Sequence, residues 1–537
     1  MKQLLSMTLI FLALLGIADA GYISYEKFRG VVPPCGNGMD CGAVLNSPWA
    51  NIGPVPLAAI GVIFYSWILL LAILNFLEFS INPIVNRLAN HLKLKKHNTL
   101  RQLTLHELLL ASTIFGAGFS AYLVYIMAVP IGAWCRYCLL SATTCASLFI
   151  TASVYYHKTV GQSPFLLKKA WYVFFHFLYT HLFKPLFFLI DPETIHNLMV
   201  SAGNMIGKIG IGKSKTQALF GFSHPILHTQ FDGAFFPNRL GLSAGFDYDG
   251  DLTQILPSVG FGWHTIGTVT LEAYEGNPKP RLGRLPESQA LIVNKGLKTI
   301  GAKALIKKLS DLELTIPVAI SIASTNKKFT SEKAQILDIL ACFRLFEGSK
   351  LKHQLYELNI SCPNTFGGEP FTTPAKLEKL LTALDSLKLK RPVYAKMPID
   401  QSETDTLALL KIVDSHQVSG IIFGNLTKDK NNPAVTKADR EIWKQRKGNL
   451  SGKPTWDRSN TLIALTKKHF KNRFTIVGTG GIFTPEDAKY KLKIGADLLQ
   501  LITGMIFEGP QTIGSINLEL ALEALSQSAE NHSKTLA

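Results

Sequence analysis

Paired cysteines with spacings suited to thiol chemistry lie near the N-terminal end of the chain. Five of the seven cysteines fall within the first 160 residues: Cys35, Cys41, Cys135, Cys138 and Cys145. The C-x-x-C spacing of Cys135 and Cys138 lets two thiols close a small disulfide ring, although it also suits a metal. The two pairs predict a relay of electrons from one pair to the other. Two permanent disulfides are the alternative, and Cys145 is expected to be a core residue.

A second group of candidate residues follows short β-type runs in the C-terminal two thirds of the chain. Several runs end in polar or glycine residues, namely Gly245, Thr268, Asn359, Lys396, Asn425, Gly480–Gly481 and Thr503–Gly504. The C-terminal ends of strands carry the active site in (β/α)8 barrels, and the loops after strands seven and eight commonly bind phosphate. These residues therefore predict a catalytic site with a phosphate-bearing ligand.

The residues of this second group follow eight predicted strands, and each strand is followed by a segment long enough for a helix. This alternation predicts an α/β fold of the (β/α)8 TIM-barrel type. The predicted strands are Leu240–Ala244, His264–Val269, Val318–Ile322, Leu355–Ile360, Val393–Lys396, Gly420–Phe423, Phe474–Val477 and Leu498–Ile502.

Four long apolar runs must position the cysteines: Leu4–Ile23, Leu57–Leu77, Leu108–Val129 and Leu139–Tyr155. Each approaches the ~20 residues that a helix needs to cross a bilayer, so a transmembrane four-helix bundle is expected. The first run could instead be a signal peptide, because Ala18-Asp19-Ala20 resembles a cleavage site. We expect it to be a retained helix.

Charge in the loops predicts the orientation in the membrane. The loop between the second and third runs carries Arg87, Lys93, Lys95, Lys96 and Arg101 against one acid, Glu78. Basic short loops stay cytoplasmic, which places the cysteine loops in the periplasm of a bacterial inner membrane and the barrel in the cytoplasm. The run Ala170–Phe183 is short and interrupted by His176 and His181, so it is expected to lie in the interface. A fifth span, the alternative, would send the barrel outside.

Composition agrees with a membrane-bound chain. The 537 residues are 47% hydrophobic and carry a formal net charge of +17. No nucleic-acid-binding motif or metal-ligand cluster accompanies that charge, so an anionic lipid surface is the expected partner. The expected domains are a transmembrane domain at 1–157, a linker with interfacial helices at 158–229, a barrel at 230–525 and a polar tail at 526–537.

Residues 1 to about 157 resemble the vitamin K epoxide reductase family. The resemblance rests on Cys35, Cys41, Ser47, the Pro54–Gly61 stretch and the sequence Trp134-Cys135-Arg136-Tyr137-Cys138. It implies electron flow from a separate periplasmic thioredoxin-like oxidase to Cys35 and Cys41, then to Cys135 and Cys138, and then to ubiquinone or menaquinone. By the same resemblance Cys138 contacts the quinone and Ser47 lines its pocket.

Residues from about 185 to 520 resemble dihydroorotate dehydrogenase. The motifs are Leu242–Asp247, Gly267–Thr270, Gly276–Arg281, Asn359–Asn364, Leu450–Gly452 and Gly478–Gly481. The segment Asp191–His196 resembles the membrane-associated, quinone-using class, in which N-terminal helices form a tunnel to the flavin. The resemblance implies FMN as cofactor and oxidation of dihydroorotate to orotate in pyrimidine biosynthesis.

The same resemblance assigns roles to individual residues. The matched FMN contacts are Ala244, Gly245, Thr268, Asn359, Lys396, Gly452, Gly481 and Thr503, and the matched substrate amides are Asn359, Asn364 and Asn425. Cys362 stands at the position of the general base, with an inert buried thiol as the alternative.

Four positions depart from the quinone-using class. Cys362 stands where that class has serine, Tyr248 replaces a lysine, Val293 replaces an asparagine and Ser321 replaces another asparagine. Flavin binding tolerates these changes better than an orthodox substrate site does. A different substrate, or a membrane-anchored barrel that has lost catalysis, is therefore the alternative to dihydroorotate oxidation.

Overall fold

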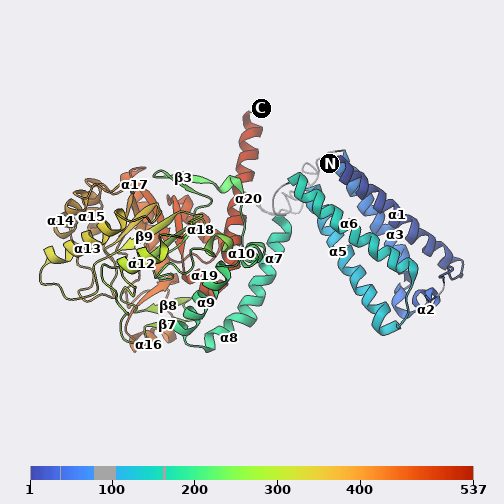
Figure 1. Ribbon diagram of the computed structural model, residues 1–537, viewed down its shortest axis with the longest axis horizontal. Coiled ribbons are helices and arrows are strands. Elements are labelled where there is room, and N and C mark those ends of the chain that lie inside the picture. Colours follow the sequence, from blue (N-terminus) through green and yellow to red (C-terminus); the bar gives the residue numbers. More distant parts are fainter. Residues whose placement is uncertain (1, 37, 78–103, 161–164, 536–537) are drawn as a thin grey trace. The chain divides into compact units, whose positions relative to one another are not determined.

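The computed structural model describes residues 2–36, 38–77, 104–160 and 165–535. The chain divides into two compact units, Met1–Ala170 and Trp171–Ala537, and each is described by itself (Figure 1). The predicted domain limits within these units stay predictions.

In its described residues the first unit is a bundle of four long helices, as the sequence predicts. They are α1 (Lys2–Phe28), α3 (Leu57–Phe76), α5 (Leu105–Ile126) and α6 (Arg136–Val160). A π-helical turn, η3 (Met127–Ile131), extends α5, and short elements join α1 to α3: α2 (Cys41–Leu45), η1 (Pro48–Ala50), β1 (Asn51–Ile52) and β2 (Val55–Pro56). The helices pack through small and aliphatic side chains such as Leu9, Ala13, Ile68 and Leu148, which are buried.

Four helices in the described part of the chain are long and apolar enough to cross a membrane. A bent pair, Lys168–Leu189 and Pro192–Gly207, would add a fifth if its two helices, which meet at 116°, formed one span. The basic loop that predicts the orientation, with Glu78 and the five cations from Arg87 to Arg101, lies outside the described residues.

The second unit is built on a closed barrel of eight parallel strands. They are β5 (Leu240–Leu242), β6 (Trp263–Val269), β9 (Val318–Ile322), β10 (Leu355–Asn359), β11 (Val393–Met397), β12 (Gly420–Phe423), β14 (Thr475–Thr479) and β15 (Leu498–Leu501), paired in that order with β15 closing on β5. These are the eight predicted runs, so the predicted fold class is confirmed. Helices alternate with them around the outside (Figure 1): α11 (Leu256–Val259), α12 (Ala302–Leu309), α13 (Glu332–Glu347), α14 (Pro374–Asp385), α15 (Glu403–Asp414), α16 (Lys437–Lys444), α17 (Trp456–Phe470), α18 (Pro485–Lys493), α19 (Thr503–Glu508) and α20 (Gln511–Thr535).

Two small sheets extend the barrel. The hairpin of β3 (Thr229–Phe231) and β4 (Ala234–Phe236) places Phe236 against Trp263, close to where the barrel strands begin. Strands β7 (Leu282–Leu285), β8 (Ala290–Val293) and β13 (Asn449–Gly452) form an antiparallel sheet beside the C-terminal strand ends. This second sheet carries Val293 and Gly452, two positions that the sequence singles out.

Helices with exposed apolar side chains precede the barrel. They are α7 (Phe165–Leu178), the π-helical turn η4 (Tyr179–Phe183), α8 (Lys184–Leu189), α9 (Pro192–Gly207) and α10 (Gly210–Leu219). Large apolar side chains face outward along α7 to α8, among them Phe174, Phe177, Leu186 and Leu189. The short run predicted at Ala170–Phe183 is thus part of a longer helical segment. Its surface suits contact with lipid.

Candidate functional site

Both cysteine pairs of the first unit belong to one apolar cluster. Cys35 and Cys41 form a disulfide with a Cα–Cα distance of 5.6 Å, whereas Cys135 and Cys138 are thiols. All four pack with Ile23, Val44, Leu45 and Met127. Cys145 is a buried thiol further along α6. The structure therefore brings together an oxidised pair and a reduced pair, which is the arrangement that thiol–disulfide exchange requires.

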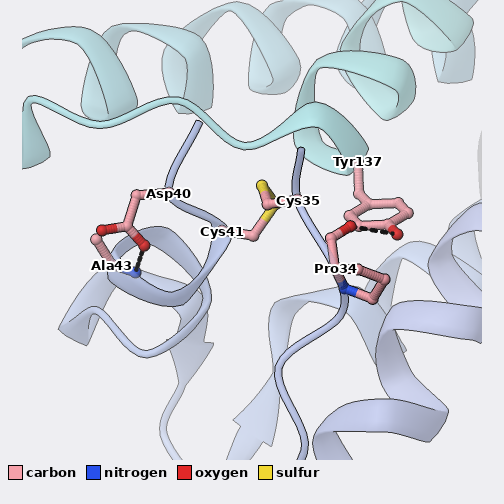
Figure 2. Close-up of a disulfide and its surroundings, with 6 residues drawn as sticks. All are labelled: Pro34, Cys35, Asp40, Cys41, Ala43 and Tyr137. Atoms are coloured by element: carbon pink, nitrogen blue, oxygen red, sulfur yellow. Dashed lines mark hydrogen bonds between the residues drawn. A yellow bond between two sulfur atoms is a disulfide. The ribbon is translucent and has the colours of Figure 1, made fainter. Parts of the chain in front are cut away.

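Two hydrogen bonds hold the Cys35–Cys41 loop against the segment that carries the second pair. The Asp40 amide donates to the Trp134 carbonyl at 3.0 Å, and the Tyr137 hydroxyl donates to the Pro34 carbonyl at 3.0 Å. Figure 2 shows Tyr137 bonded to Pro34 beside the disulfide, with Asp40 capping α2 through the Ala43 amide. The Cys35–Cys41 side thus contributes backbone groups of Asp40 and Pro34, and the Cys135–Cys138 side contributes the Trp134 carbonyl and the Tyr137 hydroxyl.

An apolar cavity opens beside the thiols. Its wall includes Cys138 and Ser47, the two residues that the sequence assigns to a quinone, together with Tyr65 and aromatic and aliphatic side chains of α1, α3 and α5. An apolar wall with few polar groups is typical of a site for a hydrophobic ring.

A second cavity lies at the C-terminal ends of the barrel strands. Five of the eight predicted FMN contacts line it, namely Ala244, Lys396, Gly452, Gly481 and Thr503, and so does the predicted substrate amide Asn425. Thr268 and Asn359 are not on its wall but are joined to each other by a hydrogen bond of 2.8 Å. Gly245 follows β5 and donates its amide to the Gly267 carbonyl at 2.8 Å.

The loop after β14 fits a bound phosphate group. Gly480 and Gly481 have φ of +92° and +73°, and a Cβ on Gly480 would stand 2.4 Å from the Thr455 hydroxyl. Only glycine allows this backbone path, which leaves main-chain atoms at the cavity wall. The buried cation of Lys396 faces the same space. Glycine loops and one cation suit a flavin mononucleotide.

A chain of buried polar groups, which the sequence did not predict, connects Lys396 to Asn359. The Thr268 and Ser321 hydroxyls are 2.9 Å apart, and Ser321 donates to Glu357 Oε1 at 2.8 Å. The same Oε1 lies 3.6 Å from Lys396 Nζ, and Glu357 is fully buried. The sequence does place an acid, Glu357, in the middle of a predicted buried strand, and this could have indicated a buried polar network. Ser321, where the resemblance expects asparagine, is thus a link in this chain.

Cys362 lies in the loop after β10. Burial raises the pKa of its thiol to about 11, although a hydrogen bond from the Asn364 amide and the charge of Lys396 act in the opposite direction. Although the side chain is only half-buried, its dense surroundings keep the thiol protonated at neutral pH, because desolvation disfavours the thiolate.

The three predicted substrate amides have protein partners. Asn364 donates to the Val293 carbonyl at 2.9 Å and accepts from Asn449 at 2.9 Å. Asn425 donates to the Ser361 hydroxyl at 2.8 Å, and Asn359 donates to Thr268. These bonds fix the orientation of each amide.

Tyr248 occupies the place of the expected lysine, and a lysine lies nearby. Lys295 Nζ is 5.5 Å from the centre of the Tyr248 ring, but it is bonded to Glu193 Oε1 at 2.5 Å. Arg281 Nε also donates to Glu193, at 2.9 Å. Burial would raise the pKa of Glu193, but the bonds from Arg281 and Lys295 lower it to about 2. The ammonium of Lys295 is therefore committed to an ion pair with α9.

Two family models match the chain. The model described as "Dihydroorotate dehydrogenase" matches residues 226–523, and the model described as "Vitamin K epoxide reductase family" matches residues 7–153. Both resemblances predicted from the motifs are confirmed. The N-terminal match and the apolar helices associate the chain with a membrane.

Individual relatives agree. A protein of Synechococcus sp. (strain JA-2-3B'a(2-13)) named dihydroorotate dehydrogenase (quinone) is 34% identical over 362 residues, covering 64% of this chain and 93% of the relative. A protein of the same name from Nostoc punctiforme is 31% identical, covering 66% of this chain and 96% of the relative. The crystal structure of DHODH in complex with ferulenol from Eimeria tenella shares the fold, with a TM-score of 0.54, 22% identity, and coverage of 63% of this chain and 93% of that one. The chain is thus an oxidoreductase of the dihydroorotate dehydrogenase family, fused on its N-terminal side to a domain of the vitamin K epoxide reductase family.

Proposed function

We propose that the barrel oxidises dihydroorotate, or a closely related dihydropyrimidine, with FMN as its cofactor and a membrane quinone as the final acceptor. The observation that carries this proposal is the cavity at the strand ends, where Lys396 and the loop Gly480–Gly481 face the same space. FMN, when bound, supplies the acceptor for the hydride that leaves the substrate.

The side chains around the cavity bind and orient the substrate and move one proton. Asn359, Asn364 and Asn425 hold the ring through amide hydrogen bonds, and the Cys362 thiolate takes the proton from the carbon next to the one that loses hydride. Lys396 stabilises negative charge at the cofactor site. Among the predicted FMN contacts, Gly452, Gly481 and Thr503 provide backbone and hydroxyl groups around the phosphate.

The proposal is tested on the purified full chain in detergent. Bound FMN is expected to give a yellow protein, and anaerobic addition of dihydroorotate is expected to bleach it, with recovery on adding a short-chain quinone. Dihydrouracil, which lacks the carboxylate, serves as the matched substrate. A protein without flavin would refute the cofactor, and a flavin that no dihydropyrimidine bleaches would refute the substrate class.

One observation favours an altered substrate. Tyr248 and Val293 replace two polar groups of the family site, and Lys295 is held by Glu193 at 2.5 Å. The ammonium of Lys295 is then held away from a substrate carboxylate, and neither Tyr248 nor Val293 supplies a charge to replace it. We therefore expect weak binding of dihydroorotate, and half-saturation in the low micromolar range would contradict this expectation.

For the first unit we propose a thiol relay. A periplasmic thioredoxin-like protein, as a dithiol, reduces the Cys35–Cys41 disulfide. The resulting Cys35/Cys41 dithiol reduces a Cys135–Cys138 disulfide and is itself reoxidised. The Cys135/Cys138 dithiol then passes two electrons to a quinone, which becomes the quinol as the Cys135–Cys138 disulfide forms again. Support comes from the common cluster of the four cysteines and from Cys138 on the wall of the apolar cavity. Cys138→Ala is expected to abolish quinone-dependent oxidation of an added dithiol. Unchanged turnover would refute the relay.

The proposed location is a bacterial inner membrane, with the cysteine loops in the periplasm and the barrel in the cytoplasm. A reporter fused after Ala537 should be active only if it functions in the cytoplasm. Activity of a periplasm-specific reporter would instead support a fifth span formed by the bent helix pair at Lys168–Gly207.

A further inference from the structure

A carboxylate lies inside the first span without a partner. Asp19 of α1 is 7% exposed, and its Oδ2 atom has no hydrogen-bond partner among the described residues. A buried carboxylate in an apolar environment is costly, so ionisable residues inside membrane spans usually face a cavity and serve function. The proposed thiol relay, in which four cysteines carry the electrons, does not use it.

Asp19 lines the same apolar cavity as Cys138. Among the described residues of that wall it is the one carboxylate, and the one basic side chain there, Lys27, donates to the Leu45 carbonyl at 2.5 Å. Tyr65, also on the wall, is bonded to the Ser141 hydroxyl at 2.8 Å and lies 3.2 Å from the sulfur of Cys145. Lys27 and Tyr65 thus have partners within the protein, whereas the Oδ2 atom of Asp19, a residue of the cavity wall, has none among the described residues.

The proposed reaction needs two proton deliveries. When Cys135 and Cys138 are oxidised, two S–H bonds break, one S–S bond forms, and the quinone gains two electrons and two O–H bonds. The two oxygens of a para-quinone lie on opposite sides of its ring. A dithiol at one edge of the ring therefore reaches one oxygen, and the other oxygen needs a second proton donor.

We propose that Asp19 protonates the quinone oxygen that lies away from the dithiol. Asp19 comes from α1 and Cys138 from the first turn of α6, so the two groups reach the cavity wall from different helices. One thiol proton goes to the near oxygen. The other restores Asp19 after it has given its own proton to the far oxygen, so the carboxyl group is unchanged after each turnover. This inference rests on the proposed thiol relay and adds a proton path to it.

The test compares three variants of the full chain in detergent, with dithiothreitol as the electron donor and a short-chain ubiquinone as acceptor. Asp19→Asn keeps the shape but cannot transfer the proton, and Asp19→Glu keeps the acid. Ser24→Ala is the matched control, because Ser24 is a buried polar residue of α1 that bonds its own helix at Ala20 and does not line the cavity.

We expect Asp19→Asn to lower kcat about 100-fold, within the range for loss of a general acid, with KM for the quinone changed less than twofold. Asp19→Glu should recover kcat to within about tenfold of the parent, and Ser24→Ala should leave it unchanged. The rate that remains in Asp19→Asn should show a larger solvent deuterium isotope effect, because proton delivery has become slower. A purely structural role would lower kcat in both Asp19 variants and leave the isotope effect unmoved.

Failure of the inference and failure of the relay give different results. If Cys138→Ala abolishes turnover while Asp19→Asn keeps the parent kcat, the relay stands and the role of Asp19 is refuted. If the parent protein itself does not reduce the quinone with a dithiol, the relay is refuted and the inference with it.

Discussion

The half-buried thiol of Cys362 leads to a quantitative prediction for the pH dependence of flavin reduction. Its pKa of about 11 lies two units above the ordinary 9.0 of the thiol, chiefly because burial disfavours the charged form. Two units correspond to about 2.7 kcal/mol against the thiolate. At pH 7 about one molecule in 10⁴ therefore carries the base in its active form, and each unit of pH raises that fraction about tenfold.

The prediction is checked by anaerobic stopped-flow measurement of flavin absorbance at saturating substrate from pH 6 to 10. The rate of reduction should rise about tenfold per pH unit, without a plateau in this range. Cys362→Ser should lower the rate at pH 9 by at least about 100-fold, since its hydroxyl ionises less readily. Cys362→Ala, which has no proton acceptor, should lower it at least as far.

Alkylation of the thiol by iodoacetamide gives an independent measurement. Its rate at Cys362 should also climb about tenfold per pH unit up to pH 10. Cys342, which is fully buried in the barrel core, provides the unreactive comparison within the same chain. A flat rate of flavin reduction, or an alkylation midpoint at the ordinary thiol value of 9.0, would refute the assignment of a thiol with a raised pKa as the base.

Three further predictions concern the barrel. Tyr248→Lys combined with Val293→Asn should raise kcat/KM for dihydroorotate at least about tenfold, because it restores a charge-assisted bond of ~1.5–3 kcal/mol; no gain would show that these positions do not set the substrate. Glu357→Gln should raise the two-electron midpoint potential of the bound flavin by about 30 mV, a tenfold change in the equilibrium constant, because a negative charge near the site is removed; spectroelectrochemical titration measures it. Glu193→Gln should cost about 3 kcal/mol of unfolding free energy at pH 7, since it leaves two cations unpaired, and thermal unfolding measured against pH checks it. Because the pKa of Glu193 is depressed to about 2, its contribution is present above pH ~4.5 and is lost as pH falls toward 2, where the two proteins should unfold alike.

The architecture was predictable because its signals are local. The strand at Val318–Ile322 and the strand at Gly420–Phe423 have the predicted limits, since both are short runs of apolar and small residues bounded by turns. The span at Leu57–Phe76 ends one residue before the predicted limit. A run of apolar residues marks a buried segment, and burial determines where these strands and helices begin and end.

The connections within the candidate sites were not predictable in the same way. Ser321 and Glu357 are 36 residues apart in sequence, and their hydrogen bond depends on the register between β9 and β10. The ion pair that holds Lys295 spans 102 residues, from α9 to the loop after β8. Periodicity reveals which face of a strand is buried, but it does not reveal which polar group on a neighbouring element will face it.

The pairing of β15 with β5 has a further consequence for a catalytic domain that is tied to a membrane. Tethering to a surface crowds proteins in two dimensions, where an unpaired strand edge could join the edge of a neighbour. In the barrel each of the eight strands has a partner on both sides, so it offers no such edge. Closure of the barrel therefore protects it against sheet-to-sheet aggregation at high local density.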